Sequence, residues 1–112
     1  MKLVTAIIQP EQLETVQKAL VRHGVAGMTI TEVSGYGRQR GHTEVYRGAE
    51  YTIDFIQKVK VEVLVDDAEA ETLVGVVLQG ARTGAVGDGK IWVVPVDTVV
   101  RVRTGESGSD AV

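Results

Sequence analysis

Aliphatic and polar residues alternate along several short stretches of the chain, which is the pattern of half-buried β-strands. The clearest stretch runs from Lys58 to Val65, where four valines share one face and two lysines and a glutamate lie opposite. Less regular aliphatic segments predict further strands at residues 2–8, 28–33 and 90–94, and a short one at 99–103. The first of these is apolar on both faces, so we expect it in the centre of a sheet.

Two segments have helical spacing instead. Apolar residues recur every three or four positions between Pro10 and Gly24, with the proline suited to the first turn of a helix and the glycine to its end. The same spacing recurs in residues 66–81, where Asp66 is the expected N-cap and Glu69 follows three residues later.

The expected order is strand, helix, strand, long loop, strand, helix, strand, within a single domain covering residues 1–112. This doubled βαβ unit predicts a ferredoxin-like α+β sandwich. Two helices cover only one face of a four-stranded sheet, and the other face would mix aliphatic residues with polar ones, a composition that suits a subunit interface. The polar residues of this face would be Thr29, Thr31, Lys60 and Glu62.

Residues 34–56 show no periodicity, and four glycines lie there among charged and aromatic residues. A loop of this length in a small domain is usually functional or mobile, so we expect a long mobile loop. Tyr46 and Tyr51 have few apolar neighbours in this segment, whereas tyrosine rings are usually buried. Each is therefore a candidate site of modification or docking. The tail, residues 106–112, is expected to fray.

The composition of the chain argues against several ligands and kinds of site. Twelve Lys and Arg against fifteen Asp and Glu give a net charge of −3, which offers no electrostatic footprint for nucleic acid. Without cysteine there is no disulfide, thiolate nucleophile or zinc–thiolate site. The apolar run after Lys2 ends at Pro10, too early for a secretory signal or a membrane span, so we expect a cytoplasmic protein.

The glycine-rich stretch at residues 83–90 is the first candidate for ligand binding. It nearly fits the Walker A pattern, but Ile91 replaces the magnesium-binding hydroxyl, and the stretch leads from a helix into a strand. Its glycines would still let backbone N–H groups converge on a phosphate, with Lys90 adding a charge. The alternative, which the stretch alone favours, is an ordinary turn with its corner at Asp88 and Gly89.

Arg101 and Arg103 would share a face if their segment is extended. Two neighbouring guanidinium groups need an anion between them, either a carboxylate of the fold or a bound polyphosphate, and the spacing alone does not decide between these. The sequence contains no metal-binding triad and no serine or cysteine nucleophile framed by a histidine and a carboxylate, so we expect no catalytic residues.

Four segments together resemble the nitrogen-regulatory PII signal-transduction proteins. The matching segments are residues 35–43, 46–51, 83–93 and 101–105, and the resemblance as a whole extends to about residue 106. Several matches in one short chain are far more specific than a single short motif. Residues 35–40 are most similar to actinobacterial members of the family.

The resemblance implies a homotrimer that binds ATP or ADP in the clefts between subunits and senses 2-oxoglutarate together with Mg2+ and ATP. On this basis we favour phosphate binding by residues 83–90 over an ordinary turn. The nucleotide-binding residues it implies are Thr29, Gly37, Arg38, Gln39, Leu64, Gly87, Asp88, Gly89, Lys90, Arg101 and Arg103. Those implied for 2-oxoglutarate are Gly37, Gln39, Arg40, Gly41 and Lys58, with Gln39 as the metal ligand.

The resemblance also implies that the long loop docks on partners: an ammonium transporter, a nucleotidyltransferase that modifies the protein, or other regulators of nitrogen metabolism. Tyr51 would be the modified residue. Adenylylation is expected by similarity to actinobacterial members, although the sequence itself does not distinguish AMP from UMP. Contact with a membrane is expected only through a transporter, without direct insertion.

The chain departs from the family at Gln9 and Ala85, where lysine is common, and at Gln57, where proline is common. We expect Ala85 to weaken nucleotide binding and Gln57 to leave the exit of the loop less rigid. Ala49 excludes the serine phosphorylation that some relatives use at that position.

We therefore expect a regulatory binding protein. An alternative is a small phosphoryl-transfer or acyl-phosphate hydrolysing enzyme on the same fold, for which the sequence shows no positioned general base. A further alternative is a structural trimer similar to divalent-cation tolerance proteins, against which the lack of cysteine and of a histidine cluster argues.

Overall fold

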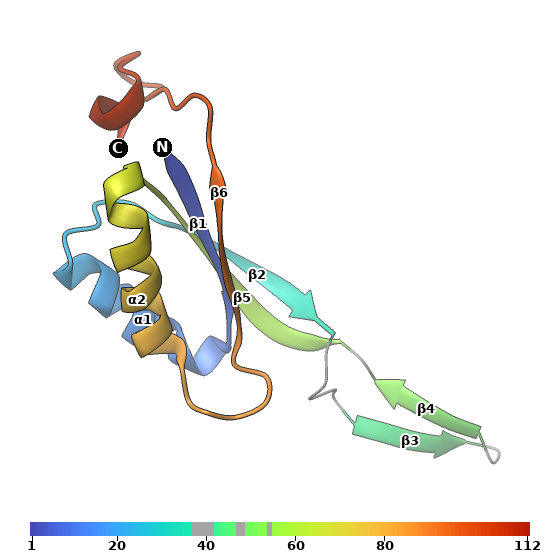
Figure 1. Cartoon of the computed structure of the whole chain (residues 1–112). Coiled ribbons are helices and arrows are strands. Elements are labelled where there is room, and N and C mark those ends of the chain that lie inside the picture. Colours follow the sequence, from blue (N-terminus) through green and yellow to red (C-terminus); the bar gives the residue numbers. More distant parts are fainter. Residues whose placement is uncertain (37–41, 47–48, 54) are drawn as a thin grey trace.

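The computed structural model of the chain describes residues 1–36, 42–46, 49–53 and 55–112. Its helices and strands, shown in Figure 1, are β1 (Lys2–Ile8), η1 (Pro10–Gln12), α1 (Leu13–Arg22), β2 (Thr29–Gly35), β3 (His42–Tyr46), β4 (Ala49–Ile53), β5 (Ile56–Val65), η2 (Asp67–Glu69), α2 (Ala70–Ala81), β6 (Gly89–Pro95) and η3 (Gly108–Ala111).

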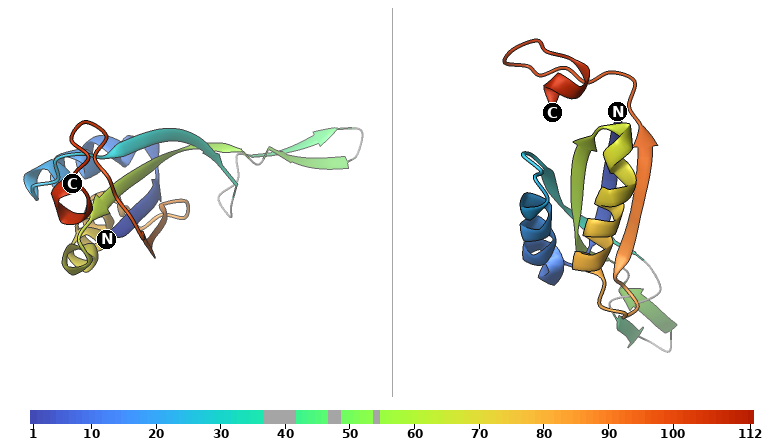
Figure 2. Two further views of the ribbon diagram at one scale, coloured as in Figure 1. Left: turned by 90° about the horizontal axis from the view of Figure 1, so that it is seen from above. Right: turned by 60° about the vertical axis from the view of Figure 1, so that its left-hand side comes forward.

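Four of the strands form one antiparallel sheet in the order β2-β5-β1-β6. Strand β1 lies between β5 and β6, as its two apolar faces predicted. Figures 1 and 2 show α1 and α2 together on one face of this sheet. The predicted ferredoxin-like α+β arrangement is therefore confirmed.

Alternation along the two central strands separates core from surface. Val59, Val61, Val63 and Val65 of β5 are buried, as the sequence predicted. The rest of the core comes from β1 and the helices: Val4, Ala6, Ile8, Val16, Leu20, Ala70, Leu73, Val77 and Ala81. Burying this apolar surface stabilises the sheet and both helices as one unit.

A proline lies at the start of α1, and a glycine lies where α1 and α2 approach closely. Pro10 lies in η1, immediately before α1, so the proline is at the N-terminal end of the helical segment as predicted. Gly80 of α2 faces α1 closely, because a Cβ there would lie 3.3 Å from the Cα of Val16. None of the helices in the described residues is long and apolar enough to cross a membrane.

The sheet face that no helix covers is partly apolar. Trp92 and Val94 of β6 are 43% and 40% exposed, and Trp92 is opposite Thr5 in the register of β1 and β6. The polar residues predicted for this face pair with one another across β2 and β5: Thr29, Thr31, Lys60 and Glu62. The face thus has the mixed character that the alternation predicted.

The segment 34–56 is more regular than expected. Strand β2 continues to Gly35, β5 begins at Ile56, and β3 and β4 pair with each other in a separate two-stranded antiparallel sheet. The prediction of a loop without strands is therefore wrong for residues 42–46 and 49–53. Both segments contain β-branched and aromatic residues, whose strand preference outweighs the lack of strict alternation.

The segment 99–103 was predicted to be a strand, and that prediction is wrong. Val100 forms only an isolated bridge with Ser107. Gly105 has φ +73°, and its N–H donates to the carbonyl of Arg101, so the chain turns back before a strand can form. The turn outweighs the strand preference of the valines around it.

The tail also departs from expectation. Residues 108–111, predicted to fray, form η3, and the Ser109 hydroxyl donates to the carboxylate of Asp66. Asp66 makes no side-chain hydrogen bond as a helix cap, so the predicted capping role is wrong. Its carboxylate binds the tail instead.

Strand β6 begins at Gly89, where the backbone lies very close to β1. Gly89 pairs with Ile8 and has φ +103°, a conformation that favours glycine. A Cβ at this position would lie 1.7 Å from the carbonyl oxygen of Ile7. Both the backbone angle and the close approach therefore require glycine.

We expect Gly89→Ala to lower the free energy of unfolding by about 2–4 kcal/mol, because the methyl group must push β6 away from β1. Urea unfolding at a fixed protomer concentration measures this difference. Gly75→Ala is the matched control: Gly75 lies within α2, and an added Cβ has nothing within 4 Å. Alanine at this position should raise the free energy of unfolding by about 0.5–1 kcal/mol, and equal effects at the two sites would contradict our account of Gly89.

Candidate functional site

The turn between α2 and β6, residues 83–88, is organised around one carboxylate. Asp88 accepts hydrogen bonds from the backbone N–H groups of Thr83 and Gly84, both at 2.8 Å, and from the Thr83 hydroxyl. The side-chain amide of Gln9, at the end of β1, donates to the same carboxylate at 3.1 Å. The hydroxyl of Thr83 and these amides hold the pKa of the Asp88 carboxyl well below its usual range, so Asp88 is ionised at neutral pH.

Lys58 contacts the same turn from β5. Its side chain is buried, and its ammonium group donates a hydrogen bond to the carbonyl of Gly87. Gly35 on the neighbouring strand leaves room for the lysine, since a Cβ there would lie 3.0 Å from the Cγ of Lys58. Among the side chains of residues 1–36 and 55–112, no carboxylate forms an ion pair with Lys58.

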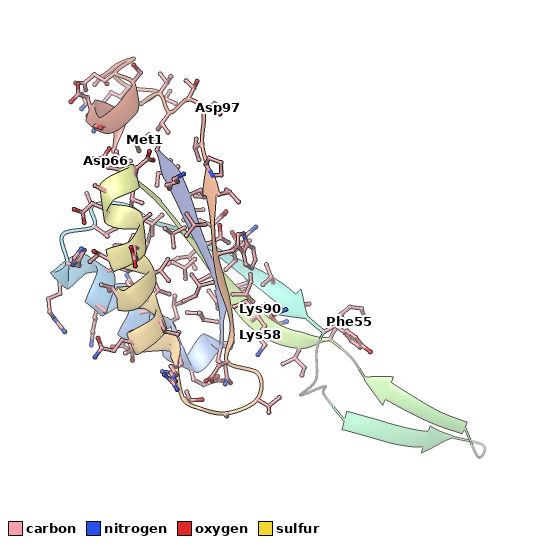
Figure 3. All side chains as sticks on the ribbon, viewed as in Figure 1. Met1, Phe55, Lys58, Asp66, Lys90 and Asp97 are labelled. Atoms are coloured by element: carbon pink, nitrogen blue, oxygen red, sulfur yellow. The ribbon has the colours of Figure 1, made fainter. Side chains whose placement is uncertain are left out.

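Lys90 extends this cationic end of the sheet. It pairs with Ile7 across β1 and β6, while Ile7 also pairs with Lys60 of β5 on its other side. Figure 3 shows Lys58 and Lys90 at the same end of the sheet. Lys60 lies 3.9 Å from Glu62, whereas Lys90 has no ion-pair partner in the part of the chain that the structure describes. The arrangement can attract and hold an anion.

Arg101 and Arg103 lie far from these lysines. Lys90 and Pro95, both in β6, are five positions apart, about 17 Å at the usual rise per residue, and the chain continues beyond Pro95 before it reaches the arginines. Figure 1 shows the C-terminal segment and the turn 83–88 at opposite ends of the four-stranded sheet. One chain therefore does not bring the two groups together.

The arginines also do not share the face of a strand. Arg101 lies at the start of the turn that Gly105 closes, and its guanidinium lies 3.1 Å from the carboxylate of Glu106. A carboxylate of the fold is thus present beside Arg101, one of the two alternatives that the sequence left open. Arg103 is exposed and has no ion pair with any described residue.

Thr29 and Leu64 lie on the uncovered sheet face, away from the lysine end. Thr29 pairs with Glu62, and Leu64 pairs with Leu3. Leu64 is six positions from Lys58 along β5, about 20 Å at the usual rise. These two residues therefore lie toward the same end of the sheet as the arginines.

Of the remaining predicted site residues, only some lie within the described ranges. Gly37, Arg38, Gln39, Arg40 and Gly41 lie outside the described residues, so the proposed metal ligand Gln39 is among them. Tyr51 lies in β4, where its backbone pairs with Glu44 of β3. No group of three His, Cys, Asp or Glu side chains in the described ranges could hold a metal ion.

Sequence reasoning missed the residues that order the turn. Thr83 entered only as part of the glycine-rich stretch, and Gln9 only as a departure from a family pattern. Their common acceptor, Asp88, was placed at the corner of a turn in one interpretation and among the nucleotide-binding residues in the other, but neither interpretation named its side chain as the acceptor of these hydrogen bonds. The available signal was a polar residue directly after a central strand, and its partner lies 79 positions away in sequence.

A shallow groove lies on the other side of the molecule, between α1 and α2. Its basic side chains include Lys18, which pairs with Glu14 at 2.8 Å, and His23, which lies 3.6 Å from Glu69. None of the predicted site residues lines this groove. The candidate site is therefore the lysine end of the sheet with the turn beside it.

Comparison with known proteins shows to which family the chain belongs. A family model described as "Nitrogen regulatory protein P-II" matches residues 1–106. Proteins named nitrogen regulatory protein P-II from Azospirillum brasilense, Synechocystis sp. and Rhizobium meliloti are 54%, 53% and 53% identical to the chain. Each alignment spans 112 residues and covers 100% of both chains. The chain belongs to the nitrogen regulatory protein P-II family.

Proposed function

We propose that the protein is a trimeric sensor of nucleotide and 2-oxoglutarate that controls partner proteins of nitrogen metabolism. The observation that carries this proposal is buried Lys58, which binds the Gly87 carbonyl but forms no ion pair with a described carboxylate. A buried ammonium group without an anion is unfavourable, so the site favours an anionic ligand. Membership in a regulatory family supports binding, rather than catalysis, as its role.

ATP or ADP is the proposed ligand of the turn 83–88 and Lys90. The phosphates would be bound by Gly87, Gly89 and Lys90, where glycines and a lysine provide backbone N–H groups and a positive charge. The second part of the site would come from a neighbouring chain, because Arg101 and Arg103 belong to the segment after β6, which lies at the opposite end of the sheet from the turn 83–88.

This division of the site requires more than one chain, and the assembly that we propose is a homotrimer, as the family resemblance implies. The uncovered sheet face, with exposed Trp92 and Val94, would be buried between protomers. Thr29, Leu64 and the two arginines of one chain would then meet Lys90 of the next. Each nucleotide site would be complete only in the assembly.

2-Oxoglutarate is the proposed second ligand. Lys58 would bind one of its carboxylates, because the ammonium group is already held at the site and forms no ion pair with a described carboxylate. Gln39 would complete the shell of a Mg2+ ion, whose preferred ligands are oxygens from side chains and phosphates. This second site would therefore depend on bound nucleotide.

The output of the sensor would be the segment 34–56. We propose that it docks on an ammonium transporter, a nucleotidyltransferase or another regulator of nitrogen metabolism, in the cytoplasm or at a membrane through the transporter. A nucleotidyl group on Tyr51 would add bulk and charge to β4 and release a partner that fits closely around it.

We expect Lys90→Ala and Arg101→Ala each to weaken ATP binding by about 1.5–3 kcal/mol, the range for a charge-assisted hydrogen bond. Isothermal titration calorimetry measures both affinities. Refolding the two variants together at equal concentration should restore about a quarter of the wild-type sites, since an intact site needs a Lys90 and an Arg101 from adjacent chains.

The controls for this experiment are the single variants and the oligomeric state. Each variant refolded alone should show no wild-type site, and light scattering should report a trimer throughout. A stable monomer at micromolar concentration would contradict the trimer. A mixed trimer that regains no site would show that the two residues do not act from different chains.

We expect 2-oxoglutarate to bind only in the presence of Mg2+ and ATP, and Lys58→Met to abolish that binding. Methionine fills a similar buried volume without the charge, so the variant tests the ammonium group and not the packing. Lys60→Met is the matched control, because Lys60 lies on the same face but pairs with Glu62. Calorimetric titration with and without EDTA is the measurement, and equal binding in EDTA would exclude the scheme.

We expect Tyr51→Phe to remove the mass shift that a nucleotidyltransferase produces, because phenylalanine lacks the hydroxyl that would be modified. Intact-mass and peptide mass spectrometry after incubation with extract of nitrogen-starved cells would locate the group. Tyr46→Phe is the control and should leave the shift in place. A shift that persists in Tyr51→Phe would reject Tyr51 as the site.

A further inference from the structure

The carboxylate of Asp88 has no free acceptor position within the turn. One of its oxygens accepts from the N–H groups of Thr83 and Gly84, and the other accepts from the Thr83 hydroxyl and the Gln9 amide. A carboxylate that already accepts four hydrogen bonds has little capacity left for a ligand. The side chain therefore serves the turn itself.

Charge leads to the same conclusion. All four donors to Asp88 are neutral, and no cation among the described residues forms an ion pair with it. The turn thus keeps a full negative charge beside Gly87 and Lys90, where phosphates are proposed to bind. A negative side chain repels a phosphate, so direct contact between the two is unfavourable.

We infer that Asp88 is a positioning residue rather than a phosphate ligand, and that Gln9 acts through it to order the turn 83–88 before any ligand binds. This inference rests on the proposed nucleotide site. It removes the Asp88 side chain from the contacts of that site and adds Gln9, which the sequence did not assign to it.

Gln9 is distinctive because it is the only one of the described donors to Asp88 that lies outside the turn. It follows Ile8, the last residue of the central strand, so its backbone position is fixed by the sheet. Lys58 holds the other side of the turn through the Gly87 carbonyl. The turn is therefore attached to β1 and to β5, and its N–H groups are oriented without a ligand.

Such order should favour nucleotide binding. A loop that is already in its bound conformation loses less conformational freedom when the ligand arrives. The residue at position 9 also sets the local charge, because a lysine could donate to Asp88 as glutamine does and neutralise it as well. Position 9 would thus influence how strongly a polyphosphate binds without touching it.

The experiment measures amide hydrogen exchange of Thr83 and Gly84 by NMR in the ligand-free protein, and ATP affinity by calorimetry. Gln9→Ala and Thr83→Val should each speed this exchange about threefold to tenfold and weaken ATP binding by a similar factor, as expected for one lost hydrogen bond. Gln9→Lys should keep the slow exchange and bind ATP more tightly than wild type at low salt, with the gain reduced at high salt.

Gln12→Ala is the matched control. Gln12 donates to the Gly80 carbonyl at 3.0 Å, so this variant removes a different glutamine side-chain hydrogen bond, near the end of α2, without touching Asp88. It should leave both the exchange of Thr83 and Gly84 and the ATP affinity unchanged.

Unchanged exchange in both Gln9→Ala and Thr83→Val would overturn the inference, whatever the ATP affinity. Faster exchange with unchanged ATP affinity would overturn the positioning role and leave only a structural one. If the wild-type protein binds no ATP, the proposed function fails, while the exchange rates still decide whether Gln9 and Asp88 order the turn.

Discussion

The pairing of β1 with β5 on one side and with β6 on the other brings the residues of the candidate site together. Ile8 pairs with Val59 and with Gly89. Residues that are distant in sequence therefore lie beside the C-terminal end of β1. Gln9 follows directly and reaches Asp88, and Lys58 reaches Gly87 from the other neighbour. The lysine end of the sheet and the turn beside it are therefore consequences of one three-stranded arrangement.

Sequence patterns predicted the parts of the fold that depend on burial. The valine alternation of residues 58–65 has one interpretation, because a shift by one position would bury lysines. The helical spacing of residues 66–81 was equally informative. The patterns failed where a few hydrogen bonds decide the conformation. The N–H of Gly105 donates to the carbonyl of Arg101 and forms a turn where a strand was predicted. The carboxylate of Asp66 accepts from Ser109 instead of capping the helical segment.

The candidate site was predictable as a set of residues, through the family resemblance, but not as an arrangement. Lys58 and the turn 83–88 are in contact within one chain. The segment that contains Arg101 and Arg103 lies at the opposite end of the sheet. Spacing along the sequence carries no information about which of the proposed site residues would come from a second protomer. The role of Asp88 was equally hidden, since a carboxylate next to glycines is compatible with ligand contact and with internal hydrogen bonds alike.

The register of β2 and β5 has a consequence for the segment between them. Gly35 and Ile56 are paired neighbours, so the two strands form in effect one hairpin whose connection is residues 36–55. The entropy of closing such a connection grows only with the logarithm of its length, about 0.6 kcal/mol for each doubling. The core therefore places little thermodynamic restriction on how long this connection is, so its length and sequence are free to match the shape of the partner that we propose it docks on.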